Sequence, residues 1–167
     1  MRFVSHISMA ASLMVSCYAE EKSSKIYGTW ISDREATSEY LLKHAKLDDY
    51  QKMVLPIIFG RMEVTYREDG TGTAILKAAR IPKRGGGEIH LEQTSIDFTF
   101  EIVGESEFQV VTKLTSGNGI MASYPFSLTR FHDRDTTSAA FSDGITNTNG
   151  REFFKRVKNK EVDKPSP

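Results

Sequence analysis

Cysteine is nearly absent from this sequence, and the chain has no excess of charge of either sign. The 167 residues include 1 cysteine, Cys17, so no disulfide can form within the chain. The fold must therefore be stabilised by its hydrophobic core. The 22 basic residues balance the 22 acidic residues, and the formal net charge is +0. Because no overall field attracts a polyanion, we expect no nucleic-acid partner.

The sequence also lacks the short motifs that carry most catalytic and metal chemistry. The stretch from Gly104 to Phe108 begins like the G-x-S-x-G elbow of hydrolases but ends without the second glycine. The 4 histidines lie far apart, and none has zinc-site spacing. No Lys-Ser or Lys-Thr pair follows Gly85–Gly87, as a phosphate-binding loop requires. We expect no catalysis, no cofactor and no metal ion.

Long apolar runs are missing after the first residues of the chain, so we expect no membrane-spanning helix. Arg2 and the mostly apolar stretch to Val15, followed by small residues, are typical of an export signal. Cleavage by a general signal peptidase after Ala19 makes residues 1–19 the signal peptide. This interpretation predicts an exported protein of the periplasm.

A second interpretation of the same segment is a lipoprotein signal. Residues 13–17, Leu-Met-Val-Ser-Cys, resemble a bacterial lipobox, although Met14 stands where leucine is usual. In that case residues 1–16 are removed and Cys17 becomes the lipidated first residue. The protein would then be tethered to a membrane of the cell envelope through Cys17.

The rest of the chain has the length of one globular domain. We assign this domain to residues 26–158, because strand and helix patterns occur throughout that range. Residues 159–167 are charged and end in Pro-Ser-Pro, a composition that favours a disordered tail.

Helical patterns interrupt the strands early in the domain, over residues 32–59. Ser32 and Glu35 have the S-x-x-E spacing of a capping box, which predicts that the first helix starts at Ser32. A second helix is expected to begin near Asp48, and Pro56 should kink or end it.

The remaining patterns are those of β-strands. Apolar and polar residues alternate in short segments separated by turn signals such as Asp69-Gly70. About eight or nine strands in meander order must close on themselves or cover their edges. The sequence therefore predicts an all-β fold, an antiparallel up-and-down barrel with a helical insertion after the first strand. The expected strands are residues 26–31, 61–67, 73–79, 88–92, 96–102, 108–114, 123–132, 137–141 and 152–157.

Three features of this pattern resemble the lipocalin-like barrel superfamily, which includes the lipocalins and the intracellular fatty-acid-binding proteins. They are Gly28-x-Trp30 on the first strand, the helical pair after that strand, and Arg156 in the last strand. In those families a terminal-strand arginine packs across the first-strand tryptophan. The resemblance implies that Arg156 lies within about 6 Å of the Trp30 ring and closes one end of the barrel.

The chain is also similar to small exported bacterial proteins that share a set of short motifs. These are G-T-W on the first strand, a helical insertion, a strand ending in D-G-T and a terminal K-R-V. Here they are residues 28–30, 69–71 and 155–157, in the same order.

Strand parity suggests a candidate binding group. On the strand at 123–132 the apolar residues Tyr124, Phe126 and Leu128 share a face, and strict alternation puts Arg130 and His132 on that face. If the face is the barrel interior, Arg130 is a buried cation that needs a carboxylate or an anionic ligand.

The resemblance to fatty-acid-binding proteins extends this hypothesis. In those proteins inward arginine and tyrosine residues hold a ligand carboxylate, which implies a cluster of Arg130, Tyr124, Tyr66 and His132 here. In the other interpretation, Arg130 and His132 lie near the strand end and reach solvent, or pair with Glu152. A β-bulge in the strand would also break the alternation and change which side chains face inward.

Two functions remain open at this stage. The first is non-catalytic binding of a small apolar or amphipathic anion inside the barrel, with the helices as a lid. The second is a structural or protein-interaction module of the cell envelope, whose barrel is filled by its own side chains and by the apolar helix end, residues 53–59. An open interior of about 300 Å³ or more favours the first. Basic residues at 77, 80, 83 and 84 either steer an anion to the barrel mouth or form a solvated loop.

Overall fold

The computed structural model describes residues 23–117, 125–141 and 150–158. The expected signal peptide, the lipidation candidate Cys17 and the expected tail all lie outside the described residues. Tyr124, one of the candidate ligand-binding residues, also lies outside them.

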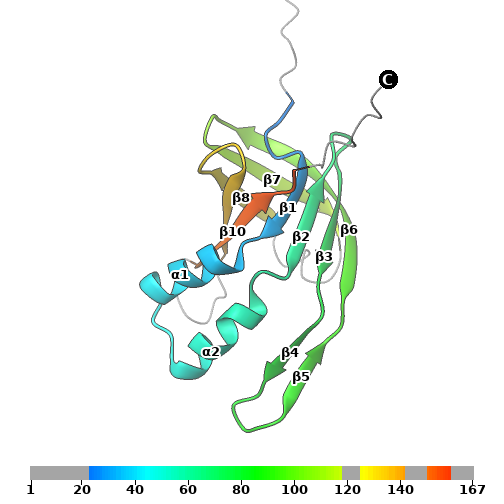
Figure 1. Ribbon diagram of the computed structural model, residues 1–167. Coiled ribbons are helices and arrows are strands. Elements are labelled where there is room, and N and C mark those ends of the chain that lie inside the picture. The colour runs from blue at the N-terminus through cyan, green and yellow to red at the C-terminus, as the bar shows by residue number, and fades with distance from the viewer. Residues whose placement is uncertain (1–22, 118–124, 142–149, 159–167) are drawn as a thin grey trace, which may run out of the picture.

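Eight strands form a closed antiparallel barrel, which confirms the fold class (Figure 1). Each barrel strand pairs with the next one along the chain, and β10 returns to pair with β1. The order is therefore the expected up-and-down meander. The barrel strands are β1 (Gly28–Ser32), β2 (Met62–Tyr66), β3 (Thr71–Leu76), β6 (Thr94–Glu105), β7 (Gln109–Ser116), β8 (Phe126–Phe131), β9 (Thr136–Phe141) and β10 (Gly150–Arg156).

A hairpin outside the barrel wall departs from the expected pattern. β4 (Ala79–Pro82) and β5 (Glu88–Leu91) pair only with each other in a separate two-stranded sheet. Figure 1 shows the hairpin extending away from the barrel, beside α2. The sequence analysis wrongly ended one strand at Ala79 and read 81–87 as a loop, because residues on both sides of the chain reversal continue the alternation.

Two helices connect β1 to β2, as the sequence predicts. The first, α1 (Arg34–His44), is capped by Asp33, whose side chain accepts a bond from the Ala36 amide at 3.3 Å. The capping box expected at Ser32 is therefore wrong by one residue. Ser32 is the last residue of β1, and its hydroxyl is used inside the barrel instead.

The second helix, α2 (Asp49–Ile58), begins where expected. Asp48 accepts a bond from the Gln51 amide at 2.8 Å, and the Gln51 side chain accepts one from the Asp48 amide at 2.9 Å. Pro56 lies inside this helix and does not end it. A proline so close to the C-terminus removes only one helical hydrogen bond, which a short helix held by tertiary packing tolerates.

The helices and the β4–β5 hairpin lie at one end of the barrel, which we call the mouth (Figure 1). There α1 packs against β10, and α2 packs against β4. The Tyr50 hydroxyl on α2 donates to the Pro82 carbonyl at 2.7 Å. Neither helix in the described part of the chain is long and apolar enough to span a bilayer.

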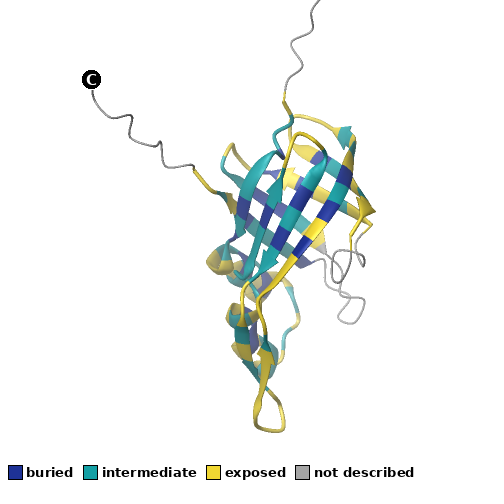
Figure 2. Ribbon diagram, turned by 90° about the vertical axis from the view of Figure 1, so that its right-hand side faces the viewer, coloured by how far each residue is buried: buried dark blue, intermediate teal, exposed yellow. Residues whose placement is uncertain are grey.

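The opposite end of the barrel is closed by a dense aromatic core. Buried and more exposed residues alternate along the strands, as Figure 2 shows. The Trp30 ring meets Phe131 edge to face with centroids 5.9 Å apart, and its Nε1 donates to the Ile26 carbonyl at 2.7 Å. Trp30 is 2% exposed. Trp30 is therefore packed tightly between the strands at this end of the barrel.

Arg156 covers the Trp30 ring at the closed end, as the sequence predicts. The guanidinium carbon lies 4.1 Å from the ring centroid. Its Nη1 donates to the Tyr27 carbonyl at 2.7 Å and its Nη2 to the Lys25 carbonyl at 2.6 Å. A Cβ at Gly28 would lie 2.8 Å from Nη1, and Gly28 has a φ of 117°. Glycine is needed there both for the backbone and for the approach of the arginine.

We predict that Arg156→Lys destabilises the fold by about 1–3 kcal/mol, because an ammonium cannot reproduce the fork of hydrogen bonds over the indole. The matched control is Arg151→Lys on the same strand, which should change stability by no more than about 0.5 kcal/mol. Equilibrium unfolding in denaturant measures both free energies. Equal losses in the two variants would contradict the assigned role of Arg156.

Candidate functional site

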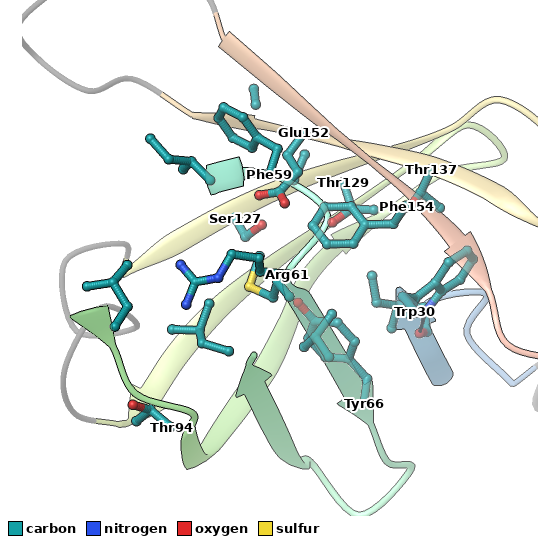
Figure 3. Close-up of a pocket in the computed structure, with 18 of the residues that line it drawn as sticks. Trp30, Phe59, Arg61, Tyr66, Thr94, Ser127, Thr129, Thr137, Glu152 and Phe154 are labelled. Carbon is teal, nitrogen blue, oxygen red and sulfur yellow. Dashed lines mark hydrogen bonds between the residues drawn. The ribbon is translucent and has the colours of Figure 1, made fainter. Parts of the chain in front are cut away.

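A cavity of about 650 Å³ occupies the half of the barrel nearer the mouth (Figure 3). Its floor includes Ile26 and Trp30, and Ile58 and Phe59 at the end of α2 lie beside its opening. The interior is therefore neither filled by barrel side chains nor plugged by the helices. The other lining residues are Arg61, Met62, Val64, Tyr66, Leu76, His90, Leu91, Glu92, Thr94, Phe126, Ser127, Thr129, Thr137, Ala139, Ala140, Glu152 and Phe154.

Two acidic residues line the cavity, Glu92 at the mouth and Glu152 in the barrel wall. Glu152 lies on β10, and its Oε1 accepts a bond from the Ser32 hydroxyl at 2.5 Å. Ser32 in turn accepts a bond from the Gly60 amide at 2.9 Å. Burial raises the pKa of Glu152, and the Ser32 hydrogen bond offsets part of that rise. Burial therefore favours the uncharged acid, which can donate a hydrogen bond as well as accept one.

Tyr66 supplies a hydroxyl from the floor of the cavity. Its ring packs edge to face against Phe98 and Phe100, with centroids 5.7 and 5.1 Å away. Figure 3 shows the hydroxyl directed into the open space. Burial raises the pKa of Tyr66 to about 12. The group therefore stays a neutral donor and acceptor over the whole physiological pH range.

Arg61 provides a positive charge at the mouth. It immediately precedes β2 and lines the cavity. Its Nε donates to the Lys77 carbonyl at 2.7 Å, and its Nη2 donates to the same oxygen. These bonds hold the side chain in place, while Nη1 has no partner among the residues that the structure describes. A fixed guanidinium with a free edge suits a carboxylate or a similar anion.

Arg130 lies on the outside of the barrel, so its expected inward orientation is wrong. The residue that faces inward on β8 is Thr129, which pairs with Val110, a core residue that is 0% exposed. Directly opposed residues share one face of a sheet, so Arg130 and its partner Gln109 face outward. The apolar residues that suggested the opposite parity include Leu128, which is 43% exposed.

His132 also lies outside the cavity. Its Nε2 forms a hydrogen bond of 2.8 Å with the Ser138 hydroxyl, and its ring stacks on Phe153 with centroids 5.5 Å apart. Burial lowers the pKa of His132, and Arg130 and Arg151 lower it further. Of the candidate cluster, the structure thus brings Tyr66 to the cavity, leaves Arg130 and His132 outside it, and does not describe Tyr124.

Sequence reasoning missed Arg61, Thr129, Thr137 and Glu152 as cavity residues. Two of these positions could have been found from the sequence, because residues two apart on a strand point to the same face and each lies two positions from a core aromatic residue. Thr129 lies two positions from the core residue Phe131, and Glu152 lies two positions from the core residue Phe154. Each therefore shares a face with an inward aromatic ring. No such signal marks Arg61, which lies outside the strand.

No known protein family and no curated protein sequence matches this chain. The functional conclusion therefore depends on the geometry and the chemistry of the cavity.

We predict that Glu152→Gln changes how stability depends on pH. A raised pKa in the folded state means that unfolding becomes easier as the pH rises above the ordinary glutamate value of 4.5, until the folded-state pKa is passed. The wild type should therefore lose stability relative to the variant over that window, measured by denaturant unfolding at several pH values. Glu39→Gln, at an exposed position of α1, controls for the change in net charge. Parallel curves for wild type and Glu152→Gln would contradict the burial of this acid.

Proposed function

We propose that the barrel binds one small amphipathic anion, with the apolar part of the ligand in the cavity and its acidic head at Arg61. The open cavity of about 650 Å³ is the observation that carries this proposal. It lies within the range of about 300–1,000 Å³ that is usual for small-molecule sites. Binding sites of this kind are mostly apolar with a few placed polar groups, as the lining is here.

Burial of hydrocarbon supplies enough energy for such a ligand. About ten methylene groups contribute roughly 8 kcal/mol when they leave water. Part of this is lost to the ordering of the ligand, and the rest is sufficient for useful affinity. No covalent step and no cofactor is needed, so the proposed function is non-catalytic.

The charge near the mouth favours an anionic head over a cationic one. Arg61 offers the free edge of its guanidinium to the cavity. The nearby hairpin carries Arg80, Lys83 and Arg84, of which Arg84 is paired with Asp48. The barrel end of this hairpin, with His90, Leu91 and Glu92, lines the cavity, and Lys83 and Arg84 lie farther out along the hairpin. There they would attract an anion toward the mouth at low ionic strength.

The resemblance to lipocalin-like barrels supports the same function. The closed eight-stranded barrel, the helical pair after β1 and the cation–π contact between Arg156 and Trp30 are all features of that superfamily. Its members bind apolar and amphipathic molecules in the barrel. An exported location belongs to the same proposal, and it depends on the signal sequence at the start of the chain.

The alternative, a structural module with a filled barrel, has less support. It requires the apolar end of α2 to enter the barrel, but Met53 is 50% exposed and Ile58 is 41% exposed. Ile58 and Phe59 border the cavity without filling it. The end of α2 therefore borders the mouth and leaves the cavity open.

We predict that dodecanoate binds the purified protein and changes its tryptophan fluorescence. The sequence has 1 tryptophan, Trp30, and its ring lines the cavity, so the signal reports directly on that space. Dodecanol, which has the same chain without the charge, should bind more weakly. A wild type whose fluorescence and thermal stability respond to neither compound would contradict ligand binding.

We further predict that Arg61→Met weakens dodecanoate binding about tenfold and leaves dodecanol binding unchanged. The reason is the loss of a charged hydrogen bond to the carboxylate. Arg130→Met, which removes an equal charge from the outer face, is the matched control and should bind both compounds like the wild type. A loss of affinity at position 130 with none at position 61 would restore the original assignment of Arg130.

A further inference from the structure

The two walls of the cavity differ in polarity. Apart from Tyr66, whose hydroxyl enters at the floor, the side chains from β1, β2 and β3 that line the cavity are apolar: Trp30, Met62, Val64 and Leu76. The wall formed by β8, β9 and β10 is mixed. It contributes the polar residues Ser127, Thr129, Thr137 and Glu152 beside the apolar residues Phe126, Ala139, Ala140 and Phe154. Figure 3 shows Trp30 and Glu152 entering the space from different parts of the barrel.

The strand register gathers the polar side chains around one small residue. Ala139 pairs with Thr129 on β8 and with Glu152 on β10, so the three form a row across the sheet. Thr137 lies two residues from Ala139 on β9 and faces the same way. Side chains opposed in this way are about 5 Å apart, and the methyl group of Ala139 leaves the space above them open.

The threonine hydroxyls in this wall open onto the cavity and have no partner in the described part of the chain. Thr129 is 6% exposed and Thr137 is 2% exposed. Neither hydroxyl makes a hydrogen bond to the part of the chain that the structure describes. Neither is fully enclosed, because the unpaired side-chain oxygen that is fully buried in that part of the chain is Ser38 Oγ. Glu152 uses its Oε1 for Ser32. Both threonines line the cavity. Hydroxyls that face a cavity are paired by its contents, so a ligand with polar groups on this side would replace water there.

We infer that the natural ligand is facially amphipathic, with a compact apolar body and hydroxyl or carbonyl groups along one side. Its polar side lies against Thr129, Thr137 and Glu152, and its apolar side against Trp30 and Val64. This inference rests on the proposed function and narrows the class of ligand. A simple hydrocarbon chain leaves the polar wall unpaired or wet, because it has no group to offer it.

A pair of steroid acids tests this, because they differ only in the hydroxyls of one ring face. Cholate carries its ring hydroxyls on a single face, and 5β-cholanate has the same skeleton and side-chain carboxylate without them. We expect the wild type to bind cholate at least fivefold more tightly than 5β-cholanate, measured by Trp30 fluorescence and by calorimetry. Dodecanoate, which has a carboxylate but no hydroxyl groups, shows whether the protein binds an amphipathic anion at all.

Isosteric variants locate the source of the preference. Thr129→Val and Thr137→Val remove one hydroxyl each and keep the shape of the wall, so each should weaken cholate binding about fivefold and leave 5β-cholanate unchanged or tighter. Thr112→Val is the matched control, because Thr112 is also a buried barrel threonine, 5% exposed, but does not line the cavity. It should leave both affinities unchanged.

The outcomes separate the two proposals. A wild type that binds dodecanoate but binds cholate no better than 5β-cholanate overturns the facial ligand and leaves the proposed function standing. Equal losses of affinity for cholate and 5β-cholanate in Thr129→Val and Thr137→Val also overturn it. A contact with the ring hydroxyls would weaken cholate binding alone. A wild type that binds none of the three anions contradicts the proposed function itself, and the facial ligand with it.

Discussion

The pairing of β1 with β10 is the contact on which the rest of the barrel depends. These strands are the first and the last of the sheet, and their pairing removes both edges. Trp30 pairs directly with Arg156, so the residues that hold the two strands together by backbone hydrogen bonds also meet through a cation–π contact. Arg156 in addition donates to carbonyls of the segment that leads into β1. Closure therefore joins the two ends of the described domain and separates an inside from an outside.

The cavity follows from that closure and from the sizes of the inward side chains. Large rings such as Phe98, Phe100 and Phe131 fill the closed end. Toward the mouth the inward positions on β8 and β9 are taken by small residues, and Ala139 is the smallest of them. The packed core ends before it reaches the end of α2, which borders the opening. The change from aromatic to small side chains along the same strands creates the binding space.

Much of this fold could be predicted from the sequence because it depends on local patterns. Alternation marked most of the barrel strands, and Gly28, Trp30 and Arg156 marked the end that closes. The site was harder, because it depends on which of the two faces of β8 turns inward. Phe126 and Leu128 are apolar yet largely exposed, while Thr129 is polar and buried. Hydrophobicity alone therefore gave the wrong parity. The register with Val110 on β7 and the buried Phe131 two positions away resolve it.

The account's central claim is that the barrel interior is open to a ligand, and filling that interior tests it most directly. Ala139→Phe places an aromatic ring in the cavity and removes no polar group, while Ala78→Phe places the same ring at an exposed position. Native mass spectrometry with excess dodecanoate should show one bound molecule on the wild type and on Ala78→Phe. It should show none on Ala139→Phe, with stability unchanged or raised. Equal occupancy in all the proteins, or a wild type without bound dodecanoate, would contradict the claim.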